Sequence, residues 1–300
     1  MYYFDSNSIL VKLNKNDLSE VGRSSVFKDI ITMSNGIVSF NNDNNYLYAA
    51  YEIASNQWKI IKIDRNTLKI VTTSANIVAS DVYTILTKDS TFLYVVISNT
   101  NSTSRTLIKK MKKSDLSVAA TSTTFGRDLD GRSFEDNSYL YIYESVDENR
   151  IVNKSNLAAV ESGTINGIAD YFAVTDKYIY TSSYVVDKSD LSKKRNLHRV
   201  GDLICGEGNY LFWFQENGKY GGTDRDDECL SGRIVITDES TSKVVYATST
   251  IYKPTTRGLK SIFTYDDNNL YVFDLKTHAI IKFAKNDQVM KNIIGYHKEW

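Results

Sequence analysis

The sequence predicts an all-β protein built from a repeated unit of four short antiparallel strands, and three observations support this prediction. Tyrosine is abundant, with 21 residues against 12 Phe and 3 Trp, and aromatic side chains favour half-buried strands. A hairpin pattern recurs seven times along the 300 residues. Asn/Asp-rich tetrapeptides, which favour tight turns, separate further apolar segments. A repeat of this kind determines the fold more firmly than the function.

The hairpin is clearest in Trp58–Val71, where two short strands are joined by a polar turn. The other copies begin near Ile9, Leu107, Arg150, Tyr184, Ile234 and Ile280. An aromatic–Leu–aromatic strand such as Tyr46–Tyr48 precedes the hairpin, with an Asn/Asp turn such as Asn42–Asn45 before it. A further strand, such as Ile37–Phe40, comes first. We name these four strands A to D in chain order.

Equivalent B-strand residues follow one another at spacings of 46, 47, 39, 32 and 59 residues. Four antiparallel strands repeated at spacings of roughly 40 to 50 residues are typical of the blades of a β-propeller. Tyr2–Asp5 aligns with the B-strand segment Tyr271–Asp274, so the first copy lacks strand A. Ile293–Trp300 follows the last hairpin and is the candidate for the missing strand. The sequence therefore predicts one domain, residues 1–300, folded as a seven-bladed β-propeller. A composite blade of C-terminal strand A and N-terminal strands B–D closes it and removes exposed edges.

Two other architectures remain open at this point. A six-bladed ring results if the short copy at Tyr178–Leu197 is not a blade. An open β-solenoid is disfavoured, because parallel coils do not need two Asn/Asp hairpin turns in every repeat.

Composition and charge disfavour several kinds of partner. The 36 basic and 36 acidic residues cancel, so we expect neither nucleic acid nor an anionic membrane as a partner. Met1–Leu13 lacks the pattern of a Sec signal, and no apolar run is long enough for membrane insertion. Cys205 and Cys229 do not form a metal-type pair and are expected to be free thiols.

The repeat resembles divergent YVTN/quinoprotein-like propellers, whose blades end in a hairpin of the type found at Lys62–Leu68. It lacks the WD, kelch and sialidase motifs; the double glycine Gly221-Gly222 occurs once. The plain polar repeat is also similar to propeller proteins of phage or phage-tail-like particles. These resemblances imply a fold and a context and do not imply an activity.

No set of residues indicates catalysis or a cofactor. Gly206-Glu-Gly208 lacks the third glycine of a dinucleotide loop. The three histidines, His198, His278 and His297, have no ligand-type neighbours. We expect no catalytic residue, metal or cofactor. The alternative is a propeller enzyme of lyase or lactonase type that gathers one residue per blade.

The B–C and D–A loops vary in length, and such loops on a rigid scaffold are the usual place for binding residues. The candidate residues are Tyr220, Asp224, Asp226, Tyr252 and Arg257. In the longest loop, Asp224, Asp226 and Glu228 follow EF-hand spacing, but Cys229 and Val235 occupy the required Gly and Glu positions. A solvated acidic loop is favoured over a weak divalent-ion or partner site. The lysines of Lys109–Lys113 and Lys193–Arg195 are likewise expected to be solvated.

The function that the sequence favours is a non-catalytic binding or scaffold module. Its expected setting is a phage or phage-tail-like particle, as a tail or baseplate component for host attachment. The expected partners are other particle proteins and a cell-surface glycan or protein. A cytoplasmic protein-interaction platform is the alternative location and role.

Overall fold

The computed structural model is described in segments. They are residues 2–4, 9–14, 17, 19–25, 37–98, 106–124, 129–144, 149–160, 173–175, 177–181, 184–198, 200–207, 210–216, 230–247, 251–253, 263–265, 269–274 and 279–284. Within these segments the chain forms strands and turns and no helix, as the sequence predicts. The described part accordingly holds no helix of the length and apolarity that crossing a membrane requires.

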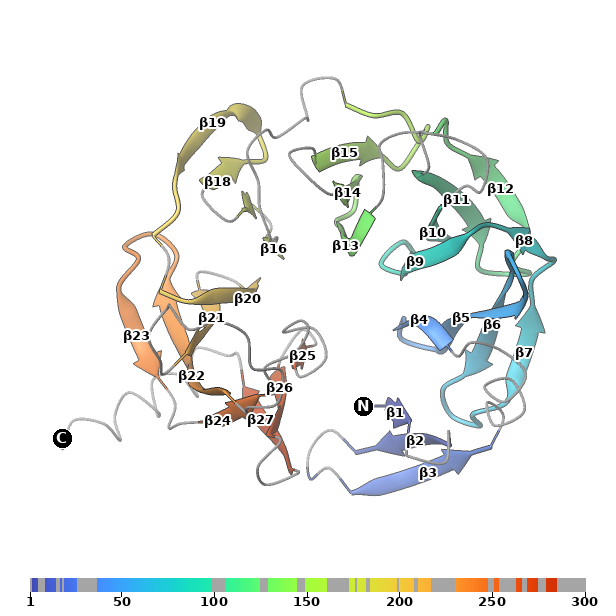
Figure 1. The fold of residues 1–300 in the computed structure, drawn as a ribbon, viewed down its shortest axis with the longest axis horizontal. Coiled ribbons are helices and arrows are strands. Elements are labelled where there is room, and N and C mark those ends of the chain that lie inside the picture. Colours follow the sequence, from blue (N-terminus) through green and yellow to red (C-terminus); the bar gives the residue numbers. More distant parts are fainter. Residues whose placement is uncertain are drawn as a thin grey trace. The chain divides into compact units, whose positions relative to one another are not determined.

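The chain divides into two compact units, Met1–Ile168 and Ala169–Trp300. The described strands form seven separate antiparallel sheets, four in the first unit and three in the second (Figure 1). The prediction of a single domain is not tested by this division. The segment Ile293–Trp300, predicted to close the ring, lies outside the described residues.

The described residues of the first unit form fifteen strands. They are β1 (Tyr2–Phe4), β2 (Leu10–Leu13), β3 (Glu20–Ser24), β4 (Ile37–Asn42), β5 (Tyr46–Ala54), β6 (Gln57–Asp64), β7 (Ile70–Thr73), β8 (Ile77–Val78), β9 (Asp81–Leu86), β10 (Phe92–Ser98), β11 (Thr106–Lys112), β12 (Val118–Thr121), β13 (Leu129–Glu135), β14 (Tyr139–Glu144) and β15 (Asn149–Asn153). Strands β4 to β7, and again β9 to β12, pair in chain order as the predicted A–B–C–D unit, and β8 extends the first of these sheets on β6.

The first sheet, β1 to β3, has three strands in the described residues. Tyr2 of β1 pairs with Lys12 in the same register as Tyr48 with Lys62 in the next sheet. Strand β1 is therefore a B strand, as its alignment with Tyr271–Asp274 predicts.

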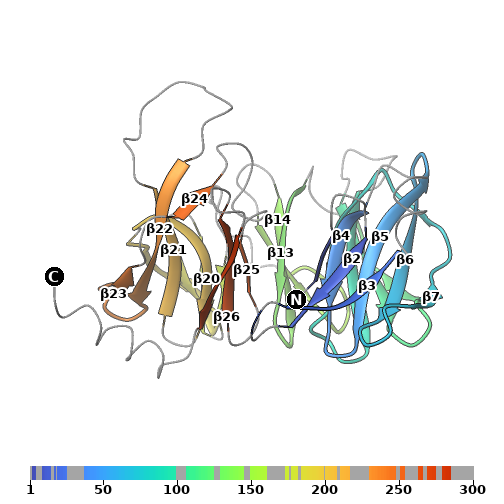
Figure 2. The same cartoon turned by 90° about the horizontal axis from the view of Figure 1, so that it is seen from below.

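Twelve strands lie in the part of the second unit that the structure describes. They are β16 (Ala173–Val174), β17 (Tyr178–Tyr180), β18 (Tyr184–Asp187), β19 (Asp190–Asn196), β20 (Asp202–Glu207), β21 (Tyr210–Glu216), β22 (Leu230–Asp238), β23 (Val244–Ala247), β24 (Ile251–Lys253), β25 (Phe263–Tyr265), β26 (Asn269–Asp274) and β27 (Ala279–Ala284). Figure 2 shows β20, β21 and β22 side by side. Strands β16 to β19 form a sheet of their own, so the short copy at Tyr178–Leu197 is a complete repeat.

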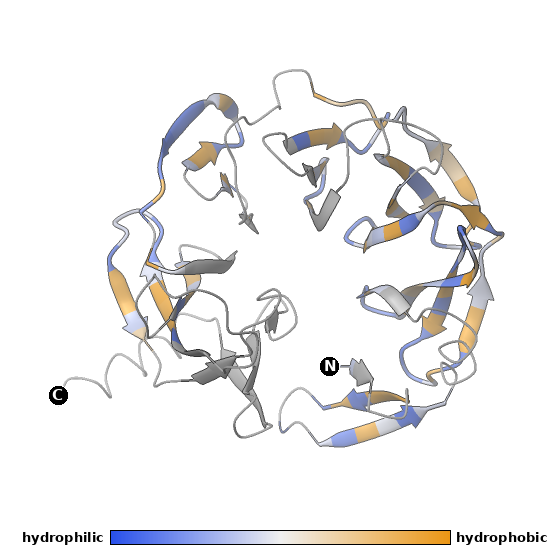
Figure 3. Ribbon diagram, viewed as in Figure 1, coloured by the Kyte–Doolittle hydropathy of each residue, from blue (hydrophilic) through white to orange (hydrophobic). Residues whose placement is uncertain are grey.

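The core of the first unit lies between successive sheets. Tyr48 and Trp58 of one sheet pack with Leu93 and Val95 of the next, and all four are buried. Strand β10 is buried along nearly its whole length, because its two faces contact different neighbouring sheets. Hydrophobic residues also occur on outermost strands such as β12, which is exposed along its whole length (Figure 3). Each large buried side chain contributes about 1.5–3 kcal/mol to folding.

The A strands of neighbouring sheets also bind each other through polar groups. Strand β9 lies beside β4 and β13. The amide of Asn41 donates to the carbonyl of Ile85 at 2.6 Å, and the Ile85 N–H donates to the Ser39 hydroxyl at 3.1 Å. The Thr87 hydroxyl donates to the carbonyl of Asn42 at 2.7 Å. These bonds hold the A–B turns of adjacent sheets close together.

Candidate functional site

Most residues of the predicted loop site lie outside the described part of the chain. Segments 217–229 and 254–262 hold Tyr220, Asp224, Asp226 and Arg257. Tyr252 lies in β24, where its backbone pairs with Ser231 of β22. The loop site, including its acidic segment, stays a prediction.

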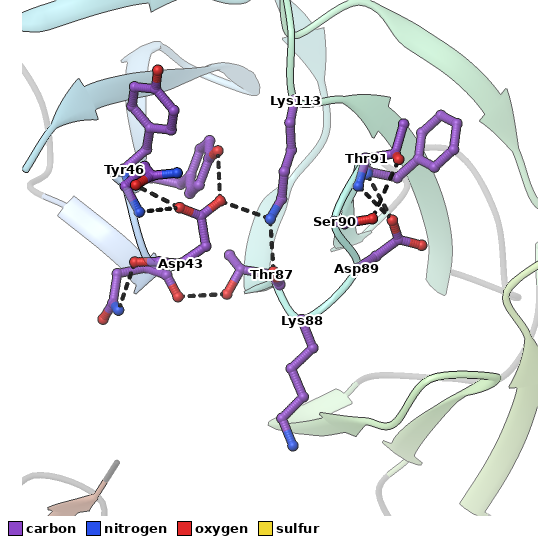
Figure 4. Close-up of polar contacts among 12 residues, drawn as sticks. Asp43, Tyr46, Thr87, Lys88, Asp89, Ser90, Thr91 and Lys113 are labelled. Carbon is purple, nitrogen blue, oxygen red and sulfur yellow. Dashed lines mark hydrogen bonds and ion pairs between the residues drawn. The ribbon is translucent and has the colours of Figure 1, made fainter. Parts of the chain in front are cut away.

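The described polar cluster is at the other ends of the strands, around the A–B turn of the second sheet (Figure 4). One carboxylate oxygen of Asp43 accepts the backbone N–H groups of Asn45 and Tyr46, both at 2.9 Å. The other accepts the hydroxyl of Tyr48 at 3.0 Å. A single aspartate thereby fixes the turn and anchors a buried tyrosine of strand B.

The same Asp-to-Tyr contact recurs in the next two sheets. Asp89 accepts the Tyr94 hydroxyl at 3.0 Å, and Asp136 accepts the Tyr141 hydroxyl at 2.6 Å. Each aspartate also accepts two backbone N–H groups of its own turn. The spacing of five residues between Asp and Tyr is therefore a structural feature of the repeat.

Lys113 joins this turn to the neighbouring sheet. Its Nζ lies 2.7 Å from Oδ2 of Asp43 and donates to the carbonyl of Thr87 at 2.8 Å. The side chains of Lys113 and Asp43 are only 10 % and 20 % exposed. Burial alone raises the pKa of Asp43, but bonds from Lys113 and the turn amides outweigh it and lower the pKa below its ordinary value. We call Asp43, Tyr48 and Lys113 the sheet clamp.

Lysines of the C strands make a second series of contacts between sheets. In each case the lysine Nζ donates to the carbonyl of the residue that follows the C strand of the next sheet. The pairs are Lys12 to Arg65 at 2.9 Å, Lys62 to Lys113 at 2.7 Å and Lys110 to Lys154 at 2.9 Å. Burial, followed by the charge of Lys113, lowers the pKa of Lys62, although Asp43 opposes this shift. Each accepting carbonyl lies just beyond the end of a C strand, and the lysine supplies it with a hydrogen-bond donor from another sheet.

The fourth sheet uses a different carboxylate. Lys154 pairs with Glu135 of its own sheet at 2.6 Å, with both side chains 5 % exposed or less. Oε1 of Glu135 accepts the backbone N–H of Lys88 from the preceding sheet at 2.5 Å. The Lys88 side chain is exposed and points away from the other labelled residues (Figure 4).

In the second unit, Lys188 keeps the cation after β18, but the sheet of β20 to β23 replaces it with an acid. Glu239 follows strand β22 at the position that Lys113 occupies after β11, and its carboxylate accepts the hydroxyl of Tyr180. Burial raises the pKa of Glu239, and Lys177 and Thr175 partly offset the shift. Arg195 donates to the Glu239 carbonyl at 3.4 Å. The contact between sheets persists although the charge at the position is reversed.

The chemistry of the clamp is that of a structural joint. Burial is the main cause that raises the pKa values of Tyr48, Tyr94 and Tyr141, and neighbouring carboxylates add to the shift. These phenols remain protonated donors at neutral pH, while Asp43 and Asp89 are ionised acceptors. Such a donor–acceptor set holds sheets together.

Sequence reasoning missed this clamp. The expectation that the lysines of Lys109–Lys113 are solvated is wrong for Lys113, which is buried, and for Lys110, which bonds a neighbouring sheet. The missed signal is the recurrence of Asp five residues before a B-strand Tyr, together with a basic residue directly after strands β6, β11 and β15. Among the described residues, no group of three or more His, Cys, Asp or Glu is arranged to hold a metal ion.

No family model matches the chain, and no curated protein matches it in sequence. Among solved structures, the chain is similar to Hsv2 of Kluyvelomyces marxianus, with a TM-score of 0.54 and 9 % identity over 84 % of this chain and 77 % of that one. It is also similar to the uncharacterized protein lmo1340 of Listeria monocytogenes EGD-e, with a TM-score of 0.52 and 10 % identity over 79 % and 74 % of the two chains. At this identity the likeness concerns the fold alone. Together with the many small antiparallel sheets, it fits an all-β fold of the β-propeller kind.

Proposed function

We propose that this protein is a non-catalytic binding module, in which rigid sheets present irregular loops to another protein or to a surface glycan. The supporting observation is that the two ends of the strands differ in structure. At the A–B and C–D turns, buried charges are committed to contacts between sheets, as Asp43 and Lys113 are. At the opposite ends, the chain between β21 and β22 departs furthest from the repeat, and such departures on a scaffold usually carry binding residues.

The finer architecture in this proposal is a closed seven-bladed propeller of the divergent YVTN/quinoprotein-like kind. Seven sheets among the described residues match seven blades. The first sheet lacks an A strand in the described residues, and residues 293–300 are the segment that we assign to it. Closure would pair the inner edge of β1 and remove an exposed edge.

We place the module in a phage or phage-tail-like particle, as a tail or baseplate component that contributes to host attachment. This placement rests on the resemblance of the plain polar repeat to propeller proteins of such particles. In this setting the loop residues Tyr220, Asp224, Asp226, Tyr252 and Arg257 contact the partner.

The proposal is tested by sedimentation of the native protein from its source, with and without deletion of residues 219–228. We expect the native protein to sediment with large particles and the deletion variant to remain soluble, with an unchanged melting temperature. Lys88→Ala, which alters an exposed side chain at the other end of the strands, is the control and should still sediment. A native protein that never sediments with a particle would contradict the placement. Undiminished sedimentation of the deletion variant would contradict the loop site.

A further inference from the structure

Strand β19 differs from the outermost strands β3, β7, β12 and β23 of other described sheets. It is the last strand in the order β16-β17-β18-β19. It spans seven residues, whereas the outermost strands β7, β12 and β23 span four each. Its last five residues are all exposed. No described strand pairs with its outer edge, which leaves a row of backbone groups available there.

The charges of β19 are concentrated in three successive residues. Lys193, Lys194 and Arg195 follow one another, and successive strand residues point to opposite faces, so both faces are basic. The Lys193 side chain is 71 % exposed and lies 3.4 Å from Asp190. The Lys194 Nζ lies 4.9 Å from the ring centroid of Tyr184, a contact on the strand's own sheet.

The pairing of β19 with β18 is incomplete. Asp187 pairs with Asp190 and Val186 with Lys194, so a register shift leaves Leu191 to Lys193 without a partner in β18. The Ser192 N–H bonds to the Asp190 carboxylate at 3.1 Å, which holds the start of this stretch. The stretch lies within strand β19, yet only part of this strand pairs with β18.

Protection against aggregation does not explain this concentration of charge. Lysines on edge strands often prevent unwanted sheet pairing. However, the outermost strands β7, β12 and β23 contain no charged residue, and in the outermost strand β3 Glu20 and Arg23 form an ion pair with each other. If edge protection governed the sequence, unpaired charges would be spread over these edges. The net positive charge is instead gathered on the longest one.

We propose that the outer edge of β19 accepts an extended acidic segment of a partner protein as an added strand. Backbone hydrogen bonds to β19 would supply affinity, and carboxylates facing Lys193 and Lys194 would supply selectivity by charge. This inference rests on the proposed binding function and adds the chemical class of one partner segment. It concerns a strand edge and not the B–C and D–A loops.

The test uses the full chain and three short fluorescent peptides, followed by fluorescence anisotropy. One alternates glutamate with valine, the second alternates glutamine with valine, and the third carries the same glutamates with prolines in place of valines. We expect only the first peptide to bind, and binding to weaken as salt rises. Lys193→Glu should reduce its affinity by about tenfold or more. Lys243→Glu, an exposed lysine beside β23 with the same charge change, should leave the affinity unchanged.

Three other outcomes would overturn the inference. Equal binding of the proline peptide means attraction by charge without strand addition, and equal binding of the glutamine peptide means pairing without charge recognition. Self-association of Lys193→Gln without binding of the acidic peptide means edge protection alone. Unchanged melting of Lys193→Glu confirms that lost binding is not lost folding. Because the loop deletion and the peptide assay are separate, sedimentation with particles can succeed while peptide binding fails.

Discussion

The clamp residues show how a repeated sheet tolerates buried charge. Removing a carboxylate and an ammonium group from water costs several kcal/mol for each ion unless they pair and their remaining hydrogen-bonding groups are satisfied. Asp43 meets this condition through two amides, one phenol and Lys113. Lys113 meets it through Asp43 and the Thr87 carbonyl.

Lys113→Met should therefore lower the free energy of unfolding by about 1–3 kcal/mol, because it leaves a half-buried carboxylate without its cation. Urea denaturation measures this loss. Lys112→Met, one residue away and exposed, is the matched control and should change stability by less than about 0.5 kcal/mol. In a double-mutant cycle with Asp43→Asn, additive losses would show that the two side chains do not interact.

Stability should depend on acid in a direction set by the turn aspartates. The pKa of Asp43 is lowered in the folded state from its ordinary value of 3.8. Its contribution is therefore present above that value and lost as the pH falls through the folded pKa. Glu239 acts in the opposite direction, because its raised pKa makes folding take up a proton. Urea titrations at several pH values should show Asp43→Asn less sensitive to acid than the wild type below about pH 4. Equal sensitivity would contradict this role.

Gly201 occupies a position where the backbone of a neighbouring strand leaves no room. A Cβ added there would overlap the carbonyl group of Phe214, at 2.8 Å from its carbon. Gly201→Ala should cost about 1–3 kcal/mol, because a backbone atom must move. Gly22→Ala is the control, since its Cβ would meet Leu68 at an ordinary 3.5 Å. Thermal melting compares the two, and equal melting temperatures would contradict the close approach.

At the scale of the element, the C–D turn explains why leucine recurs inside a polar hairpin. Leu68, Leu116 and Leu157 have φ values of 56°, 59° and 58°. These values lie in the left-handed region, which residues other than glycine rarely adopt. Each donates its N–H to the last residue of strand C, as Leu68 does to Asp64 at 2.8 Å. Each is also buried in a core between sheets. Burial of the side chain compensates for the strain.

This geometry reverses the usual effect of glycine. At Leu68, both Ala and Gly lose the buried side chain, but only Gly relieves the strain, which is about 1–2 kcal/mol. We expect Leu68→Gly to melt no lower than Leu68→Ala. At Leu47, a buried residue of strand β5, Gly should be worse than Ala by about 1 kcal/mol. If the Gly variant melts below the Ala variant at both positions, the proposed strain in the turn is contradicted.

The strands could be predicted from the sequence because each hairpin carries local information. Trp58–Val71 contains two apolar stretches joined by a polar turn, and it forms most of β6 and the start of β7 as expected. The clamp could not be predicted in the same way. A lysine such as Lys113 is ordinarily solvated, and its burial depends on an aspartate that the fold, rather than the sequence, brings near. The leucines of the C–D turns recur in the sequence of the hairpins, but their positive φ values could not be predicted from it.

At the scale of the whole molecule, the described residues form seven sheets, and the first of them has no described A strand. Strand β1 could be placed as a B strand from the sequence, because Tyr2 aligns with other B strands and pairs in their register. The loop residues proposed for binding are a different matter. They depart from the repeat, so neither periodicity nor a neighbouring copy specifies their geometry.

Truncation after Asn292 tests the proposed seven-bladed closure most directly. If residues 293–300 form the inner strand of the first blade, their removal exposes an edge of β1 and removes burial worth about 1.5–3 kcal/mol for each large side chain. If the ring is closed in this way, the truncated protein should aggregate or melt at a much lower temperature. Addition of residues 293–300 as a peptide should then restore part of the lost melting temperature. A soluble monomer with unchanged melting would contradict the closure and the count of seven blades.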